Sequence, residues 1–194
     1  ATFTYEYSDN IGSERGISLP ANGVHAVDGF IVREMHRRCN YSEFDVQFAL
    51  AAIEKEMKLS ILRNVRYPSG DTSKTIYYHH QYVRSGVISI AILPYITEGN
   101  IVNMPVNYLN KLAIILRELL KYKPFELVTV HDSFASHANN VNWVRWNYKE
   151  IMADIADGHL LDDLLSQLND MPVKFDMFSN DLGDHIRKSN YALT

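Results

Sequence analysis

The residue of greatest chemical interest is Asp132, which directly follows a short run of apolar and β-branched residues at positions 125–130 and then His131. That run has the alternation of a strand with one buried face, so Asp132 is predicted to fall in the turn at its end. A carboxylate held there by a rigid element, and open to solvent on one side, suits a divalent cation such as Mg²⁺. Aspartate is also a favoured turn residue, and a turn without a metal is the more frequent explanation of the local sequence.

Two histidines accompany this aspartate as candidate site residues. His131 directly precedes Asp132, and His25 lies before a predicted helix, where a core or capping role is the alternative to contact with a substrate. The chain has no Gly-rich phosphate loop of standard spacing, no G-x-S-x-G elbow and no H-E-x-x-H zinc helix. Ser133 is too close to His131 in sequence for the two to act as nucleophile and base. Metal-assisted phosphoryl chemistry at Asp132 is the natural use that remains.

The elements around Asp132 are predicted to be mainly helical. Apolar residues at helical spacing predict three helices, over residues 107–122, 140–156 and 160–168. Pro124 ends the first of them, and residues 133–137 can return as the second strand of a hairpin. Beyond Pro172 the pattern is that of an irregular tail. These elements predict an α+β fold in which helices pack on a small antiparallel sheet.

The N-terminal part of the chain is expected to deliver His25 to a fixed place. Residues 1–24 are polar and punctuated by glycines, with a possible edge strand at 2–7 and a loop after it. Asp28 can cap the helix that follows. The apolar side chains of that helix are expected to face inward and its arginines outward, at positions 33, 37 and 38.

The middle of the chain has a different pattern. A helix is predicted over 42–58, with Ser42 as its N-cap and an inward stripe made of Phe44, Phe48, Ala51, Ala52 and Ile53. Strands are predicted at 75–83 and 87–93. Basic residues beside tyrosines in this stretch could hold single-stranded nucleic acid by charge and stacking, the candidates being Arg63, Arg66 and Lys74. A solvated surface with ordinary strand tyrosines explains the same residues and is the preferred interpretation.

Bulk properties exclude some classes of protein. The chain has 194 residues and a formal net charge of −4, which argues against a free-standing nucleic-acid binder but not against a catalytic module that touches nucleic acid locally. Its single cysteine, Cys39, permits no internal disulfide and fits a reducing, cytoplasmic setting. No apolar run approaches the length of a membrane span, so no membrane partner is expected.

Three segments, in the same order along the chain, resemble single-subunit RNA polymerases of the phage and mitochondrial type. Residues 130–134 (Val-His-Asp-Ser-Phe), followed by Ser-His-Ala at 136–138, are similar to motif C, the carboxylate motif of the polymerase palm. Gly16-Ile17 to Pro20, then Val24-His25 and Asp28-Gly29, resemble the histidine segment that precedes motif C. The tail at 180–186, with 189–192, resembles the C-terminal foot of the phage enzymes.

The resemblance implies two-metal nucleotidyl transfer in DNA-directed transcription. Asp132 would be one of two carboxylates that hold the Mg²⁺ ions, and His131 would position the 3′ end of the RNA or support the turn. His25 would lie near the new base pair and the incoming ribose. The implied partners are the DNA template, the RNA product and nucleoside triphosphates, and the implied location is the cytoplasm, of an infected bacterium if the enzyme is from a phage.

The resemblance also divides the chain, as the C-terminal palm and fingers portion of a right-hand polymerase. Residues 1–40 would be the histidine segment and the helix leading into the palm, 41–106 an insertion, and 107–194 motif C and the foot. In the best-known phage enzymes a single helix joins the histidine segment to motif C, so the insertion is more like the enlarged polymerases of some phages. The family's other palm aspartate, and the fingers helix with its Lys, Arg and Tyr, are expected before Ala1 or in a separate subunit. By itself the chain is therefore expected to be inactive.

Two alternatives remain open. Family A DNA polymerases also carry His-Asp at this turn, but they usually follow it with Glu, where this chain has Ser133. A choice between ribonucleotides and deoxyribonucleotides as substrates would separate the two. The other alternative is a non-catalytic interaction subunit that retains the palm shape, which would not bind Mg²⁺ or Mn²⁺ near Asp132 once its partner is present.

Overall fold

The computed structural model describes residues 18–61, 65–177 and 179–190. Its α-helices are α1 (Ser18–Cys39), α2 (Glu43–Ser60), α3 (Ser73–Ser85), α4 (Val106–Leu119), α5 (Val141–Asp157), α6 (Leu160–Asn169) and α7 (Leu182–Lys188). Two short 3-10 helices are η1 (Ile90–Tyr95) and η2 (Ala138–Asn140), and the strands are β1 (Val128–Val130) and β2 (Ser133–Ala135). The expected α+β class is confirmed in coarse form, as helices with one small antiparallel sheet in the described residues.

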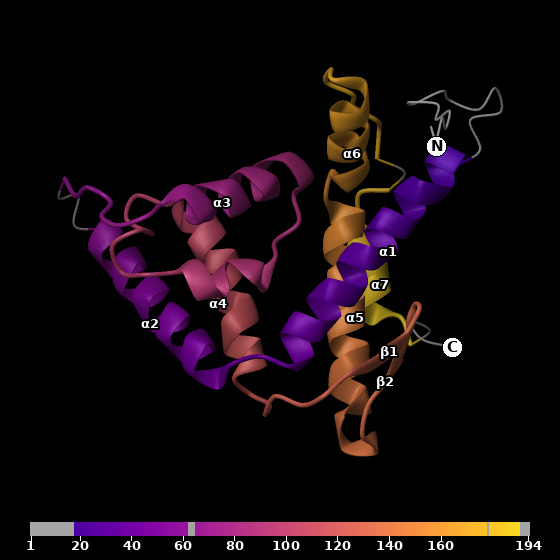
Figure 1. Ribbon diagram of the computed structural model, residues 1–194, viewed down its shortest axis with the longest axis horizontal. Coiled ribbons are helices and arrows are strands. Elements are labelled where there is room, and N and C mark those ends of the chain that lie inside the picture. The colour runs from indigo at the N-terminus through magenta and orange to yellow at the C-terminus, as the bar shows by residue number, and fades with distance from the viewer. Residues whose placement is uncertain (1–17, 62–64, 178, 191–194) are drawn as a thin grey trace, which may run out of the picture.

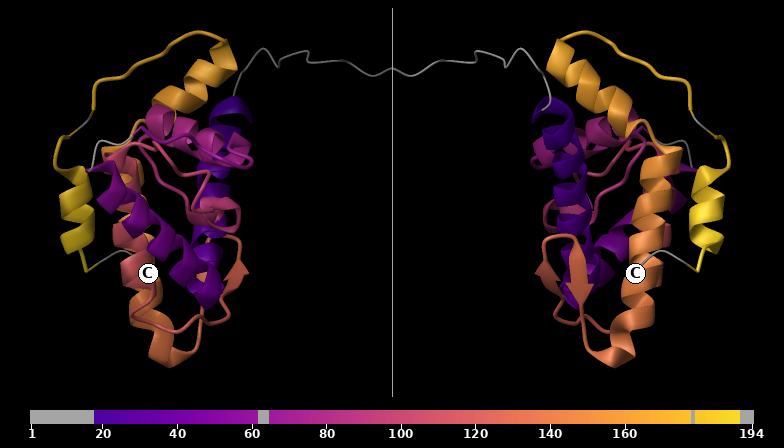
Figure 2. Two further views of the ribbon diagram at one scale, coloured as in Figure 1. Left: turned by 90° about the vertical axis from the view of Figure 1, so that its left-hand side faces the viewer. Right: turned by 90° about the vertical axis from the view of Figure 1, so that its right-hand side faces the viewer.

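The helices form two groups (Figure 1). Helices α2, α3 and α4 lie on one side, and α1, α5, α6, α7 and the hairpin of β1 and β2 lie on the other. Helix α7 packs along α5, as Figure 2 also shows. None of the helices in the described ranges is long and apolar enough to cross a membrane.

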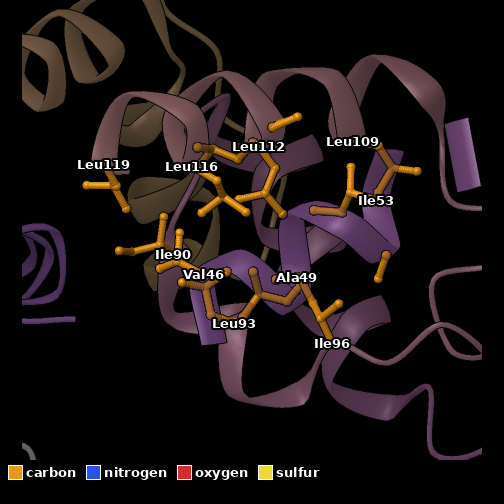
Figure 3. Close-up of a cluster of buried hydrophobic side chains, with 14 of the residues drawn as sticks. Val46, Ala49, Ile53, Ile90, Leu93, Ile96, Leu109, Leu112, Leu116 and Leu119 are labelled. Atoms are coloured by element: carbon orange, nitrogen blue, oxygen red, sulfur yellow. The ribbon is translucent and has the colours of Figure 1, made fainter. Parts of the chain in front are cut away.

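The first group is held together by the packing of α2 and η1 on α4 (Figure 3). Helix α4 places an apolar residue on the same face at every third or fourth position, and Leu109, Leu112, Leu116 and Leu119 are all buried. These leucines contact Val46, Ala49 and Ile53 of α2 and the isoleucines of η1. The segment at 41–106 therefore shares a core with the helix that follows it.

The second group has a smaller core in which α1 and α5 support the hairpin. Ile31, Met35 and Cys39 of α1 pack with Leu127, the residue just before β1, and with Val144 and Ile151 of α5. A backbone hydrogen bond from Phe125 to the carbonyl of Cys39, 2.8 Å long, fixes the chain just before the strand. The hairpin thus rests on two helices that come from distant parts of the sequence.

The two groups contact each other at several places, among them the surroundings of Glu34 and the end of α3. The buried carboxylate of Glu34 on α1 accepts hydrogen bonds from Ser89 Oγ (2.7 Å) and Ile90 N (2.9 Å) of the other group. At the end of α3, Gly86 and Gly158 approach closely, and His159 N donates to Ser85 O at 2.6 Å. A Cβ atom on Gly158 would lie 2.6 Å from the Ser85 carbonyl oxygen, so this contact requires a residue without a side chain.

Several predicted elements are confirmed. The helices predicted at 107–122, 140–156 and 160–168 correspond to α4, α5 and α6, and the hairpin lies where it was expected. Regular pairing covers 128–130 and 133–135, which is shorter than the predicted strands. Ser42 caps α2 as predicted, because its Oγ accepts a hydrogen bond of 3.2 Å from Asp45 N. The possible edge strand at 2–7 lies outside the described residues.

The predicted inward stripe of α2 is partly wrong. Ala52 and Ile53 are buried, but Phe44 is 74% exposed and Phe48 45% exposed. The residues that face α4 instead include Val46 and Ala49. Two overlapping sets of residues on α2 have helical spacing, and the set with the smaller side chains allows the closer approach to α4.

The predicted strands at 75–83 and 87–93 are both wrong. Residues 73–85 form α3, and the second run contains an irregular segment followed by the start of η1. Within α3 the less exposed residues Thr75, Tyr78, His79 and Tyr82 recur at helical spacing, so packing on one face outweighs the strand propensity of the tyrosines. Helix α3 ends at Gly86, which adopts the left-handed conformation with φ 73°.

The predicted start of the first helix is also wrong. Helix α1 begins at Ser18, so His25 and Asp28 lie within it and Asp28 is not its cap. Arg38, predicted to face outward, is buried, because the buried Glu34 carboxylate accepts from its Nε at 3.3 Å and compensates its charge. The tail beyond Pro172 is not wholly irregular, since residues 182–188 form α7.

Candidate functional site

Asp132 lies at the tip of the hairpin, in the two-residue turn that joins β1 to β2. Val130 pairs with Ser133, so only His131 and Asp132 remain between the strands. His131 adopts a left-handed backbone conformation with φ 56°, which is uncommon for a residue with a side chain and closes the turn. Both side chains are exposed. The predicted position of Asp132 at the end of a strand is thereby confirmed.

One face of the hairpin is anchored and the other is open. On the anchored face, Leu127 is 4% exposed, and the ring of Phe134 lies 5.8 Å from that of Tyr148 on α5. His36 Nε2 of α1 lies within hydrogen-bond distance of Thr129 Oγ1, at 3.3 Å. On the open face, Val128 and Val130 are both more than 60% exposed. Asp132 is therefore held by a supported element that presents an uncovered apolar face beside it.

Tyr148 of α5 is influenced by two carboxylates, one of them Asp132. The pKa of Tyr148 is raised above its ordinary value of 10.0, first by burial and then by the negative charges of Asp132 and Asp28. The two carboxylates come from different elements and both act on the same phenol by their charge. Neither Tyr148 nor this role of Asp28 was predicted from the sequence. The available signal was a tyrosine within the otherwise apolar stripe of α5.

His25 lies on α1, one turn before Asp28 and exposed to solvent. Residues three apart on a helix are neighbours on its surface, so His25 and Asp28 share a side of α1. Within the described residues, no hydrogen bond or ion pair joins His25 to His131 or Asp132. The structure thus places His25 and the hairpin in the same group of elements without bringing them into direct contact.

The carboxylate at the turn is the type of ligand that Mg²⁺ prefers, but the turn does not supply enough ligands for a complete site. Exposed carboxylate oxygens are the ligands that this hard cation prefers, and Asp132 supplies them from a fixed turn. However, no group of three or more His, Cys, Asp or Glu side chains in the described ranges is arranged to hold a metal ion. Asp132 could therefore serve only as part of a ligand set.

Of the predicted basic contact residues, the described part of the chain contains Arg66 and Lys74, and each has its own partners. Arg66 Nη1 forms an ion pair of 2.7 Å with the Glu56 carboxylate, which offsets its charge. The Lys74 ammonium lies 5.9 Å from the ring centroid of Tyr77 and 5.7 Å from that of Tyr95, in an exposed cation–π arrangement. Arg63 lies outside the described residues. Lys74 with its two tyrosines is the part of this run that retains a cation beside exposed aromatic rings.

Comparison with known proteins identifies no family: no protein-family model and no curated protein sequence matches the chain. The features available for a functional proposal are therefore those of the chain itself. The foremost is the exposed aspartate at the tip of a hairpin that two helices support.

Proposed function

We propose that this chain is the C-terminal part or a subunit of a DNA-directed RNA polymerase, and that Asp132 is one of its metal-binding carboxylates. The observation that carries the proposal is the position of Asp132, exposed in a two-residue turn whose strands are anchored by Leu127 and Phe134. Its support from the sequence is the resemblance of residues 130–134 to motif C of the phage and mitochondrial enzymes.

Each residue of the turn has a distinct role in this proposal. The Asp132 carboxylate contributes oxygen ligands, and the anchored strands hold those oxygens in place. His131 closes the turn in its left-handed conformation and presents its imidazole to solvent beside the carboxylate, where the 3′ end of the RNA would lie. When bound, two Mg²⁺ ions would activate the 3′-hydroxyl group and stabilise the leaving pyrophosphate.

The rest of the ligand set has to come from outside the described residues. A single carboxylate binds Mg²⁺ weakly, because the ion gives up its water reluctantly and requires several ligands in fixed geometry. A second polymerase segment would supply the other aspartate and the fingers helix. The open face of the hairpin, with Val128 and Val130, is a surface that such a segment can cover. The isolated chain is expected to synthesise no RNA.

Replacing the carboxylate tests the proposal directly. In the complete enzyme, Asp132→Asn keeps the size of the side chain but removes its charge, so RNA elongation should fall by at least about 100-fold. Template affinity should be largely unchanged, because in this proposal Asp132 is a metal ligand and not a contact of the DNA. Asp170→Asn is a matched control, since Asp170 is also exposed and lies in a left-handed cap where Asn is well accepted. Near-normal elongation by Asp132→Asn would refute the assignment.

The same assay separates the RNA enzyme from a DNA polymerase. The complete enzyme is supplied with ribonucleotides or deoxyribonucleotides on one primed DNA template. We expect incorporation of ribonucleotides, because Ser133 stands where family A DNA polymerases usually carry Glu. Preferential incorporation of deoxyribonucleotides would retain the role of Asp132 and overturn the assignment to transcription.

A further inference from the structure

An apolar groove lies where the N-terminal half of α1 meets α6 and the segment before α7. Its volume is about 660 Å³, and its walls include Val24 and Val27 of α1, Leu161 and Leu164 of α6, and Phe175. Figure 1 shows α6 extending beyond the other helices of its group. The groove is formed by elements other than the hairpin, and no residue of the His131–Asp132 turn lines it.

The leucine side chains of helix α6 are not fully buried by the rest of the described chain. It carries five leucines, at positions 160, 161, 164, 165 and 168, and none of them is fully buried. The leucines of α4 at 109, 112, 116 and 119, by contrast, are all buried. Leu161 and Leu168 are 56% and 50% exposed. Complete burial of one leucine side chain is worth about 1.5–3 kcal/mol, so a ligand that covers them gains free energy.

The charges along this groove have one sign. The ionised residues among its walls are Asp162 and Asp176, and no lysine or arginine lines it in the described part of the chain. Asp162 lies 3.6 Å from His159 Nδ1 and accepts a hydrogen bond from Phe175 N, while Asp176 forms no ion pair with another described residue. A ligand in this groove therefore meets an apolar floor and a negative rim.

We propose that this groove binds a helix of a protein partner, with a row of large apolar side chains flanked by lysines and arginines. The apolar row would fill the channel between α1 and α6, and the flanking cations would face Asp162 and Asp176. This inference does not depend on nucleotidyl transfer. Two other classes of ligand are disfavoured by the rim, because nucleic acids and anionic membranes are both repelled by its negative charge.

The chain's own N-terminal residues are disfavoured by the same argument. Residues 1–17 contain three acidic side chains, Glu6, Asp9 and Glu14, against one basic side chain, Arg15. Their net charge therefore has the sign of the rim. The lysines and arginines of a basic partner would be attracted to Asp162 and Asp176, whereas the acidic N-terminal segment would be repelled by them.

A pair of synthetic peptides tests the proposal on the unmodified 194-residue chain. Both peptides are about five helical turns long, carry a fluorescein label and have leucines along one face; one has lysines at the flanks and the other glutamates. Fluorescence anisotropy should show saturable binding of the lysine peptide, at least about tenfold tighter than the glutamate peptide and weaker in high salt. Equal binding of the two peptides would overturn the proposal.

Variants locate the binding site. Val24 and Leu161 are 62% and 56% exposed, so Val24→Lys with Leu161→Lys should leave the fold intact and weaken the lysine peptide by about tenfold or more. The control replaces two exposed apolar residues of the other helix group, Phe44→Lys with Ile61→Lys, and should have little effect. Equal losses in the two double variants would show that the peptide binds elsewhere.

Three further measurements exclude the other occupants. Vesicles of anionic lipid and a single-stranded DNA oligonucleotide should not compete with the lysine peptide. In the full chain, Phe3→Ser with Tyr5→Ser should leave the peptide affinity unchanged. A rise in affinity would show that the chain's own N-terminal residues occupy the groove, and competition by vesicles or DNA would identify a different ligand class. Either result would overturn the assignment to a protein helix.

Discussion

Leu127 anchors the hairpin, and its replacement by alanine tests how the turn is held. The Leu127 side chain is 4% exposed and packs with Ile31, Met35 and Ile151 at the base of β1. Deleting a buried leucine side chain costs its transfer free energy plus the free energy of the cavity that remains, about 2–5 kcal/mol. Because the core of this group is small and the open hairpin can partly collapse into the gap, we expect about 3 kcal/mol.

The neighbouring residue supplies a control on the same strand. Val128 is 61% exposed and points to the opposite face of the hairpin, so Val128→Ala should change the free energy of unfolding by less than about 0.5 kcal/mol. Urea denaturation of the full chain, followed by circular dichroism, measures both variants. A loss of about 3 kcal/mol corresponds to a melting temperature lower by roughly 6–12 °C.

Two results would refute this account of the hairpin. One is a loss of less than about 1 kcal/mol for Leu127→Ala, which would mean that the base of β1 is not part of a packed core. The other is an equal loss for Val128→Ala, which would mean that both faces of the hairpin are covered. If the chain is part of the proposed polymerase, Leu127→Ala should also reduce elongation by the complete enzyme, because the oxygens of Asp132 would no longer be held in fixed positions.

Four further predictions concern the packing of Gly158, the Tyr148 phenol and the basic residues. Gly158→Ala should lower the free energy of unfolding by about 1–3 kcal/mol in urea denaturation, because its Cβ would overlap two carbonyl oxygens at 2.6 and 2.8 Å. The pKa of Tyr148 should fall in Asp132→Asn, because one of the negative charges that oppose its ionisation is removed. The absorbance of tyrosinate, measured as the difference between the chain with Tyr148 and the Tyr148→Phe variant, reports this pKa. An unchanged pKa would show that the charge of Asp132 does not act on Tyr148. Ionisation of this phenol should also cost stability as pH rises above 10.0, since its pKa is higher in the folded chain than in the unfolded one. If the basic run contacts nucleic acid, Arg66→Gln with Lys74→Gln should lower template affinity and reduce its salt dependence, whereas no change in either would assign these residues to plain surface.

The helices with one strong apolar period could be predicted from the sequence. In α4 the leucines form a single stripe and Pro124 ends the pattern, so only one helical face can be buried. The hairpin was expected as one possibility for a similar reason, since a short apolar and β-branched run ends at an aspartate, a favoured turn residue, and residues 133–137 can return as a strand. In both cases the residues that determine the element lie within a few positions of one another in the sequence.

Elements with two competing patterns could not be predicted. Helix α2 has two overlapping apolar sets, and only packing against α4 selects Val46 and Ala49 over Phe44 and Phe48. Helix α3 contains tyrosines of high strand propensity, yet it is helical because one of its faces packs on the first core. The burial of Arg38 likewise depends on Glu34, one turn away, and on the elements that enclose both.

The position of Asp132 after a strand and in a turn could be predicted from its neighbours, because strand alternation and turn preference act within a few residues. The surroundings of that carboxylate depend instead on how elements from different parts of the chain pack. Asp28 lies on α1 and Tyr148 on α5, and the charges of Asp28 and Asp132 both act on the Tyr148 phenol because α1 and α5 share a core with the base of the hairpin. The packing of apolar faces thus brings together polar groups that no local pattern connects.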